Sequence, residues 1–433
     1  MSLGFLASYL EKHGIRVSII DELAGQNVKR QLQLFSPDIV GITATTPVAA
    51  DAYRIAAVAK KMGMVTVMGG VHASILPEEA RGHVDVVVVG EGEDALLDIV
   101  KNNIRSGIVS RTYLKDLDDI PLPARHLMQM DYYVRTKDRF PQTYLYFVPA
   151  RTKVAALLTS RGCPYDCIFC HNTWKNMPYR FSSPARVIEE IEGLIRDYGV
   201  QALFFIEDNF FVHKHRVARI CEEMVKKKFN VIWGANARVD NIDEDILLKA
   251  KQAGCRQVTF GFESGSQKIL DILQKKTTVT QNVRAIELCN KVGIVPQGTV
   301  MIGNPHETLE DIRETQRFIS NAAIESIGVC ITTPYPGTAL WEWCRKTHGI
   351  SGKIDWARFD YDRVVIPVSN TMSAARIKQL QLETIALIAH KRHIGFWGLV
   401  RAAVLHPFAA VRIMMHPSYV AVIIKRIFGR SRG

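Results

Sequence analysis

The sequence predicts an α/β protein with two parallel-sheet domains and a helical, basic C-terminal region. Buried β-branched runs alternate with helical spacing from Met1 to about Lys101, and the same alternation resumes for six further units between Lys153 and Thr333. No acidic residue follows Glu383. The length of 433 residues is typical of two or three domains. We expect the boundaries at 1–115, 116–150 (a linker with several prolines), 151–345 and 346–433.

The first domain is expected to hold a doubly wound parallel sheet. Helical spacing over Leu3–Leu10 leads to a strand expected at Val17–Asp21, and further strands are expected at Ile39–Ile42, Val65–Met68 and Val86–Val89. Continuous β-branched runs indicate strands that are buried on both faces, as in a parallel sheet covered by helices.

Glycine or threonine follows three of these strands. Ligands of open α/β sheets bind outside the carboxyl ends of the strands, and glycine lets the backbone approach a bulky cofactor. Each glycine alone is explained by a tight turn, but three such loops at one edge predict a cofactor site. Its candidate residues are Thr43, Thr45, Gly69, Gly70, His72, Gly90 and Glu91.

The second domain is expected to be a partial (β/α)6 barrel of the TIM type. Right-handed crossovers between successive parallel strands leave few other arrangements, and the chemistry of such a barrel belongs on the loops after the strands. The six expected strands are Val154–Thr159, Ala202–Ile206, Val231–Ala235, Gln257–Phe262, Val295–Ile302 and Ile327–Thr332.

Three cysteines follow the first of these strands with C-x3-C-x2-C spacing. Cys163, Cys167 and Cys170 would bring three thiolates to one loop, and soft anionic ligands of this kind suit iron–sulfur chemistry. Three ligands would leave one iron of a cubane cluster open. A Cys3His zinc site that uses His171 is an alternative, as is haem attachment at the C-x-x-C-H pattern. Haem attachment would require a secretory signal, which the residues after Met1 do not resemble.

The charge pattern argues against a general nucleic-acid footprint. The net charge is +12, but eight basic residues after Glu383 account for most of it, so the body of the chain is nearly balanced. The five cysteines outside the loop are single and widely spaced, which indicates reduced thiols and a cytoplasmic protein.

The C-terminal stretch Ile394–Phe428 combines aromatic and aliphatic residues with Arg401 and Arg412, which share a helix face. Two interpretations stay open: docking on anionic lipid at the inner membrane face, or packing of a helix on the barrel. No uninterrupted apolar run reaches the length of about 18 residues that a spanning helix needs.

The chain resembles the radical S-adenosylmethionine (SAM) superfamily, specifically its cobalamin (B12)-binding branch. The cysteine loop with Phe169 before its last cysteine carries the superfamily resemblance. Further motifs carry the resemblance to the branch, namely Gly69-Gly70-Val71-His72, Gly90-Glu91-Gly92-Glu93, Gly261-Phe262-Glu263-Ser264-Gly265-Ser266 and Thr333-Pro334-Tyr335-Pro336-Gly337-Thr338.

The resemblance implies that the three cysteines hold a [4Fe–4S] cluster whose open iron chelates SAM. It further implies that Phe169 lies near the adenine, that Asp208, Arg238 and Glu263 position the methionine and ribose, and that Gly303 lets the backbone approach the nucleoside. Cobalamin is the third expected cofactor. Two features depart from the branch. Its members usually carry one more strand before the segment that starts at Met1, so either the start lies upstream or the domain is reduced. No Asp-x-His-x-x-Gly motif supplies a histidine for cobalt.

The expected activity is cobalamin-dependent C-methylation of an unactivated carbon in a small-molecule or lipid-like substrate. The resemblance implies that one SAM is used to make a radical and another to remethylate cobalamin, with flavodoxin or ferredoxin as reductant. A radical rearrangement or oxidative cyclase without methyl transfer is one alternative, and a non-catalytic metal-binding scaffold is another. A transfer-RNA methylthiotransferase is disfavoured because residues 1–162 contain no cysteine for a second cluster.

Overall fold

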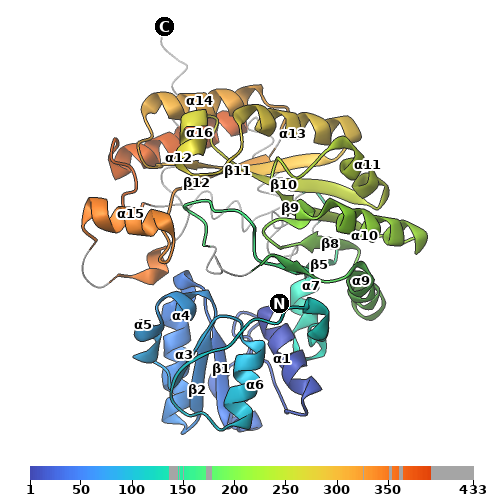
Figure 1. Ribbon diagram of the computed structural model, residues 1–433, viewed down its shortest axis with the longest axis vertical. Coiled ribbons are helices and arrows are strands. Elements are labelled where there is room, and N and C mark those ends of the chain that lie inside the picture. The colour runs from blue at the N-terminus through green and yellow to red at the C-terminus, as the bar shows by residue number, and fades with distance from the viewer. Residues whose placement is uncertain are drawn as a thin grey trace.

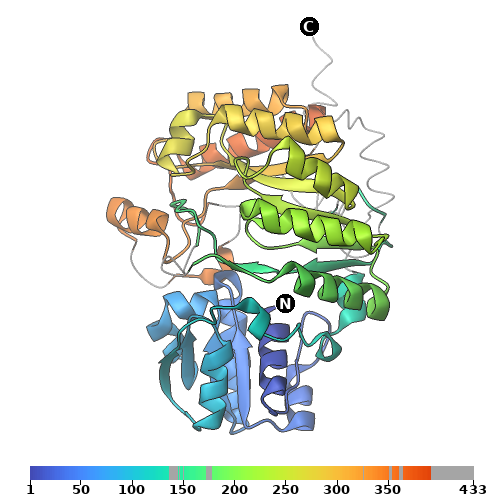
Figure 2. The ribbon, with the colours of Figure 1, turned by 45° about the vertical axis from the view of Figure 1, so that its right-hand side comes forward.

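The computed structural model describes residues 1–135, 145, 147–149, 151–171, 178–324, 326–350, 354–359 and 364–391. Two α/β units are stacked on each other, with the N-terminal unit below the barrel unit in Figure 1. The side view keeps the same two layers, and the chain start lies near their junction (Figure 2). The predicted fold class is therefore confirmed.

The N-terminal unit is a parallel sheet of four strands in the order β1-β2-β3-β4. The strands are β1 (Ile39–Thr43), β2 (Val65–Gly69), β3 (Val86–Val89) and β4 (Gly107–Ser110). Helices α3 (Ala49–Lys61), α4 (Val71–Ile75) and α5 (Pro77–Arg81) cover one face, and α6 (Glu93–Lys101) packs on the other beside α1 (Ser2–Lys12). Helices on both faces match the doubly wound prediction, whereas β4 was not predicted.

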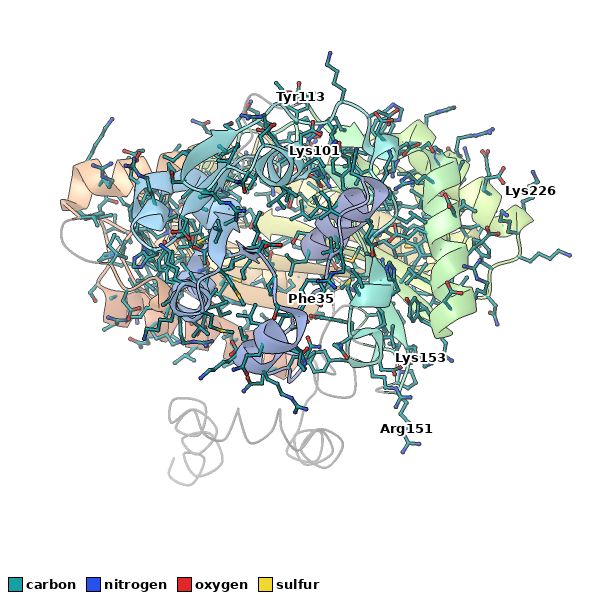
Figure 3. All side chains as sticks on the ribbon, turned by 90° about the horizontal axis from the view of Figure 1, so that it is seen from below. Phe35, Lys101, Tyr113, Arg151, Lys153 and Lys226 are labelled. Carbon is teal, nitrogen blue, oxygen red and sulfur yellow. The ribbon has the colours of Figure 1, made fainter. Side chains whose placement is uncertain are left out.

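The strand predicted at Val17–Asp21 is absent, which corrects the sequence-based expectation. No backbone hydrogen bond joins this fully described segment to a neighbouring strand, and β1 pairs with β2 alone. A cavity of about 830 Å³ is lined by both Val17–Ile20 and β1, together with α1 and α2 (Val28–Phe35). Phe35, at the end of α2, is one of the lining residues and is labelled in the view from below (Figure 3). A run of β-branched residues is thus insufficient to form a strand, because a strand exists only where a partner satisfies the hydrogen bonds of its backbone.

The segment expected as a linker packs against both units. It carries the short helical turns η2 (Leu117–Asp119), η3 (Arg125–Leu127) and α7 (Met130–Val134). Leu117 and Ile120 are buried against Phe5 and Tyr9 of α1, while α7 packs into the barrel core. These contacts fix the two units relative to each other.

The barrel unit is a six-stranded, fully parallel sheet in the order β12-β11-β10-β9-β8-β5. All six predicted strands are confirmed: β5 (Val154–Leu157), β8 (Ala202–Phe205), β9 (Ile232–Ala237), β10 (Cys255–Glu263), β11 (Val295–Ile302) and β12 (Ser326–Ile331). The intervening helices are α9 (Pro184–Tyr198), α10 (Lys214–Lys226), α11 (Glu244–Gln252), α12 (Gln267–Ile272), α13 (Val279–Val292) and α14 (Leu309–Asn321).

The helix termini follow ordinary capping chemistry. The Ser183 side chain accepts the Arg186 N–H at the start of α9, Pro184 stands in its first turn, and Gly199 ends the helix in the left-handed conformation. The cap of α14 is the Thr308–Asp311 capping box.

After β12 the chain forms α15 (Ala339–His348), η5 (Trp356–Arg358) and α16 (Ala374–Lys391). The last of these helices packs on the barrel, where Gln381 donates a hydrogen bond to the carbonyl of Val329 at 2.8 Å. None of the helices in the described part of the chain combines the length and apolarity needed to cross a membrane. The predicted amphipathic tail, Ile394–Phe428, lies outside the described residues.

Candidate active site

The cysteine loop lies directly after β5, at the barrel mouth, as predicted. Its first strand, β6 (Ser160–Arg161), pairs with β7 (Arg180–Phe181) in an antiparallel hairpin that the sequence did not predict. Gly162 then adopts a φ of +84°, a conformation that favours glycine. The main chain of Ile168 is held from both sides, because its N–H donates to the Leu273 carbonyl at 3.1 Å and its carbonyl accepts from the Leu340 N–H at 2.9 Å. The loop is therefore anchored by the barrel and by α15.

The three cysteine thiols lie close enough to affect one another electrostatically. Burial raises the pKa of Cys163, and burial followed by the charges of Asp208, Cys163 and Cys167 raises the pKa of Cys170 to about 12. Three mutually repelling thiolates require a cationic partner, which a cluster of iron ions supplies. Within the described residues, no three Cys, His, Asp or Glu side chains are already arranged to hold a metal ion. The donor set fits a [4Fe–4S] cluster in its chemistry.

Arg238, at the end of β9, joins the cysteine loop to the barrel. Its guanidinium lies 3.6 Å from the centre of the Tyr165 ring, and its Nη1 is 3.7 Å from the Sγ of Cys167. It also pairs with Asp240 and donates to the carbonyl of Lys275 at 2.7 Å. Hydrogen bonds to the sulfur ligands are one of the features that tune an iron–sulfur cluster.

Glu263 and Lys275 form a buried ion pair at 2.8 Å beside the same loop. The residue Glu263 has a φ of +61°, which is rare for a residue other than glycine, so its neighbours hold it under strain. The Lys275 Nζ lies 5.9 Å from the centre of the Phe169 ring. Glu263 and Phe169 thus meet around a lysine that sequence reasoning missed, since Lys275 stands in a loop without a recognisable motif.

Gly303, expected at the nucleoside, lies in a loop after β11 with a φ of +90°. Its N–H donates to Glu307, which also accepts from Asn304, and burial raises the pKa of Glu307 to about 7. A Cβ at Gly303 would lie 3.1 Å from Ile377 of α16. The local backbone therefore requires glycine here irrespective of any bound nucleoside.

Five of the residues predicted to bind cobalamin line the 830 Å³ cavity: Thr43, Gly69, Gly70, Gly90 and Glu91. The barrel contributes Arg161, Gly162 and Asp208 to the same cavity wall. Gly70 has a φ of +91°, and a Cβ there would lie 2.7 Å from the hydroxyl of Thr43. The carboxyl edge of the N-terminal sheet and the cysteine loop therefore share one cavity.

The other two predicted cobalamin residues, Thr45 and His72, do not line this cavity. Thr45 is exposed before η1 (Thr46–Val48). The His72 ring is fully buried, with its Nε2 3.0 Å from the Tyr53 hydroxyl and its plane nearly perpendicular to the Trp356 ring. Burial lowers the pKa of His72, which favours a neutral ring.

Glu207, next to Asp208, is a cavity-wall residue that the predicted site did not include. One of its carboxyl oxygens accepts the Thr159 hydroxyl at 2.5 Å, and the other has no hydrogen-bond partner among the described residues. Burial raises the pKa of Glu207 to about 7. Its place after β8, in Ile206-Glu207-Asp208-Asn209, was the available signal, but adjacent acids do not reveal which of the two is buried.

Two family models match the chain, one for each unit. The model of the radical SAM superfamily matches residues 157–319, and that of the B12-binding domain matches residues 1–100. The first covers the cysteine loop and most of the barrel, and the second covers the sheet whose loops line the cavity.

Curated relatives cover much of the chain. An uncharacterised methyltransferase of Pyrococcus horikoshii is 30% identical over 424 residues, which span 92% of this chain and 87% of the relative. An anaerobic magnesium-protoporphyrin IX monomethyl ester cyclase of Rubrivivax gelatinosus is 30% identical over 375 residues, or 78% of this chain and 65% of the cyclase. The chain thus spans most of the first relative and about two thirds of the second.

Solved structures share the fold. The cobalamin-dependent SAM radical enzyme OxsB, with aqua-cobalamin and SAM bound, gives a TM-score of 0.69 at 18% identity, over 89% of this chain and 63% of OxsB. The radical SAM methyltransferase TsrM of Kitasatospora setae, with cobalamin and a [4Fe-4S] cluster bound, gives 0.66 at 18% identity, over 90% of this chain and 87% of TsrM. At this identity the likeness concerns the fold of the two stacked units.

Proposed function

The chain belongs to the B12-binding branch of the radical SAM superfamily, whose cofactors are a [4Fe–4S] cluster, SAM and cobalamin, and we propose on this premise that it methylates an unactivated carbon. The substrate class that we propose is a small-molecule or lipid-like compound. The observation that carries the proposal is the shared cavity, which is lined by Gly70 and Gly90 after strands of the N-terminal sheet and by Gly162 of the cysteine loop.

Residues of the two units would bind different cofactors. Cys163, Cys167 and Cys170 would hold the cluster, and Arg238 would donate a hydrogen bond to the sulfur of Cys167 at 3.7 Å. The carboxyl-edge loops at Thr43, Gly70 and Gly90 would cradle cobalamin where the backbone leaves room for it. When bound, the cluster and SAM supply a radical that removes hydrogen from an unactivated carbon, and cobalamin supplies the methyl group.

A labelled-methyl experiment tests this proposal. The protein is reconstituted anaerobically with iron, sulfide and cobalamin, reduced with flavodoxin or dithionite, and incubated with deuteromethyl-SAM and an apolar small-molecule extract of the source cells. We expect 5'-deoxyadenosine and S-adenosylhomocysteine to form together and the label to enter an extracted molecule. Cys163→Ala is the matched control and should form neither nucleoside.

A second candidate function is a ring-forming or rearranging radical reaction, which the 30% identity to the magnesium-protoporphyrin ester cyclase favours. In the same experiment it predicts 5'-deoxyadenosine without S-adenosylhomocysteine and without label transfer. A metal-binding scaffold predicts no cleavage of SAM at all, even by fully loaded protein.

A further inference from the structure

Two arginines and two glutamates form a buried ion-pair cluster where the two units meet. We call Glu91, Glu93, Arg161 and Arg180 the Arg–Glu junction. The Arg180 guanidinium is bidentate on Glu91, with Nη2–Oε1 at 2.5 Å and Nη1–Oε2 at 3.1 Å. The Arg161 guanidinium bonds Glu93 at 2.6 Å and lies 3.3 Å from the same Glu91 oxygen that Arg180 holds.

The burial of these four side chains separates them from ordinary surface pairs. Their exposed fractions are 12% for Glu91, 4% for Glu93, 19% for Arg161 and 7% for Arg180. Removal of one partner from such a cluster leaves a buried charge without compensation, which is costly. The pair Glu310–Arg317 on α14 is more than half exposed on both sides, and pairs of that kind contribute little.

The two arginines stand at the base of the cysteine loop. Arg161 and Arg180 are direct cross-strand partners in the β6–β7 hairpin, and like charges in such a pair repel each other. The carboxylate of Glu91 bonds both of them and so neutralises the repulsion. All three cluster cysteines lie in residues 162–171, the described stretch that directly follows the first strand of this hairpin.

The glutamates belong to the other unit. Glu91 and Glu93 follow β3, in the same turn as Gly90 and Gly92, which line the shared cavity. Arg180 also donates to the carbonyl of Leu114 and lies over the Tyr113 ring, so the junction holds the chain that follows β4 as well. Both carboxyl oxygens of Glu91 bond arginines. This arrangement favours a structural role for Glu91 over the predicted direct contact with cobalamin.

We propose that Glu91 and Glu93 are positioning residues that fix the cysteine loop, and therefore the cluster, relative to the cobalamin-binding edge of the N-terminal sheet. The inference rests on the proposed function, since the relative position matters for chemistry only when both cofactors are bound. A positioning role differs from a purely stabilising one in its consequence. When the Arg–Glu junction is weakened, the cluster would move relative to cobalamin.

Electron-spin coupling between the two cofactors tests the inference without any substrate. Wild-type protein, Glu91→Gln, Arg180→Lys and the control Glu310→Gln are loaded anaerobically, and iron and cobalamin contents are measured. Electron paramagnetic resonance then records the dipolar splitting between the reduced cluster and the cobalt(II) form of cobalamin. We expect a shifted and broadened splitting in Glu91→Gln, a smaller shift in Arg180→Lys, which keeps the charge but loses the bidentate geometry, and no change in the control.

Loaded Glu91→Gln protein with the wild-type splitting would overturn the inference. Wild-type protein that takes up neither cofactor would instead overturn the proposed function. If Glu91→Gln loads poorly, hydrogen exchange of the cofactor-free proteins replaces the spin measurement. Amides of residues 162–171 should then exchange at least about tenfold faster than in wild type while those of β10 stay unchanged, and unchanged exchange in the loop would also count against the inference.

Discussion

The two sheets of this protein are built from the same strand–helix alternation, yet their edge strands are buried to different degrees. In the barrel unit, large side chains such as Trp233 and Phe205 are fully buried, and even the edge strand β5 buries Val154 and Leu157. In the N-terminal unit, β1 has one partner, and the side chains of Ile39 and Val40 are only half-buried beside the cavity. The barrel therefore provides rigid support for the cysteine loop, whereas the N-terminal sheet borders a cavity that can hold a cofactor.

The largest expected effect is on the rigid side of this comparison, where a substitution removes a ligand from the cysteine loop. Cys163→Ala removes one of three cluster ligands and should abolish reductive SAM cleavage, with iron content and absorption falling to background. Cys330→Ser is the matched control and should keep its iron, because β12 stands at the opposite end of the strand order from β5. Retention of a full cluster by Cys163→Ala would contradict the assignment of the site.

A matched pair of isoleucines tests the difference in packing. Ile302→Ala in β11, where the side chain is fully buried, should lower the free energy of unfolding of the barrel by about 2–5 kcal/mol. Ile39→Ala in β1 removes a half-buried side chain at the cavity and should cost less than half as much. Denaturant unfolding of both variants measures the two losses, and equal losses would break the comparison.

Amide exchange tests the unpaired edge directly. Amides of β10, which is flanked by β9 and β11, should exchange at least about a hundredfold more slowly than those of Val17–Ile20, which have no strand partner. Hydrogen-exchange mass spectrometry of the full chain resolves both segments. Equal protection would show that the N-terminal segment is paired in solution.

The smallest expected effect is the pH dependence contributed by Glu207. Burial raises its folded pKa to about 7 from 4.5, so as the pH rises the unfolded state releases its proton first. Stability should therefore fall between about pH 4.5 and 7, by about 1–3 kcal/mol, and level off above pH 7. Glu207→Gln should remove this part of the slope, whereas the exposed Glu310→Gln should leave it intact. Unfolding curves at several pH values provide the measurement.

Local sequence patterns were sufficient for most of the barrel and for the place of the cysteine loop. Every predicted barrel strand is present because buried β-branched runs, capping residues such as Ser183 and Thr308, and helical periodicity act over short distances. The same local evidence was misleading at Val17–Asp21, where strand formation depends on a distant partner.

Residue types and spacing along the chain were enough to identify the alternating α/β architecture, the three thiols on one loop and the glycine-rich edge of the first sheet. Folding in three dimensions determined which distant groups meet. It placed Lys275 against Glu263, Arg238 against Cys167, and Arg161 and Arg180 against Glu91 and Glu93. The physical reason is that charge pairing and burial depend on separation in space, which periodicity within one segment does not encode.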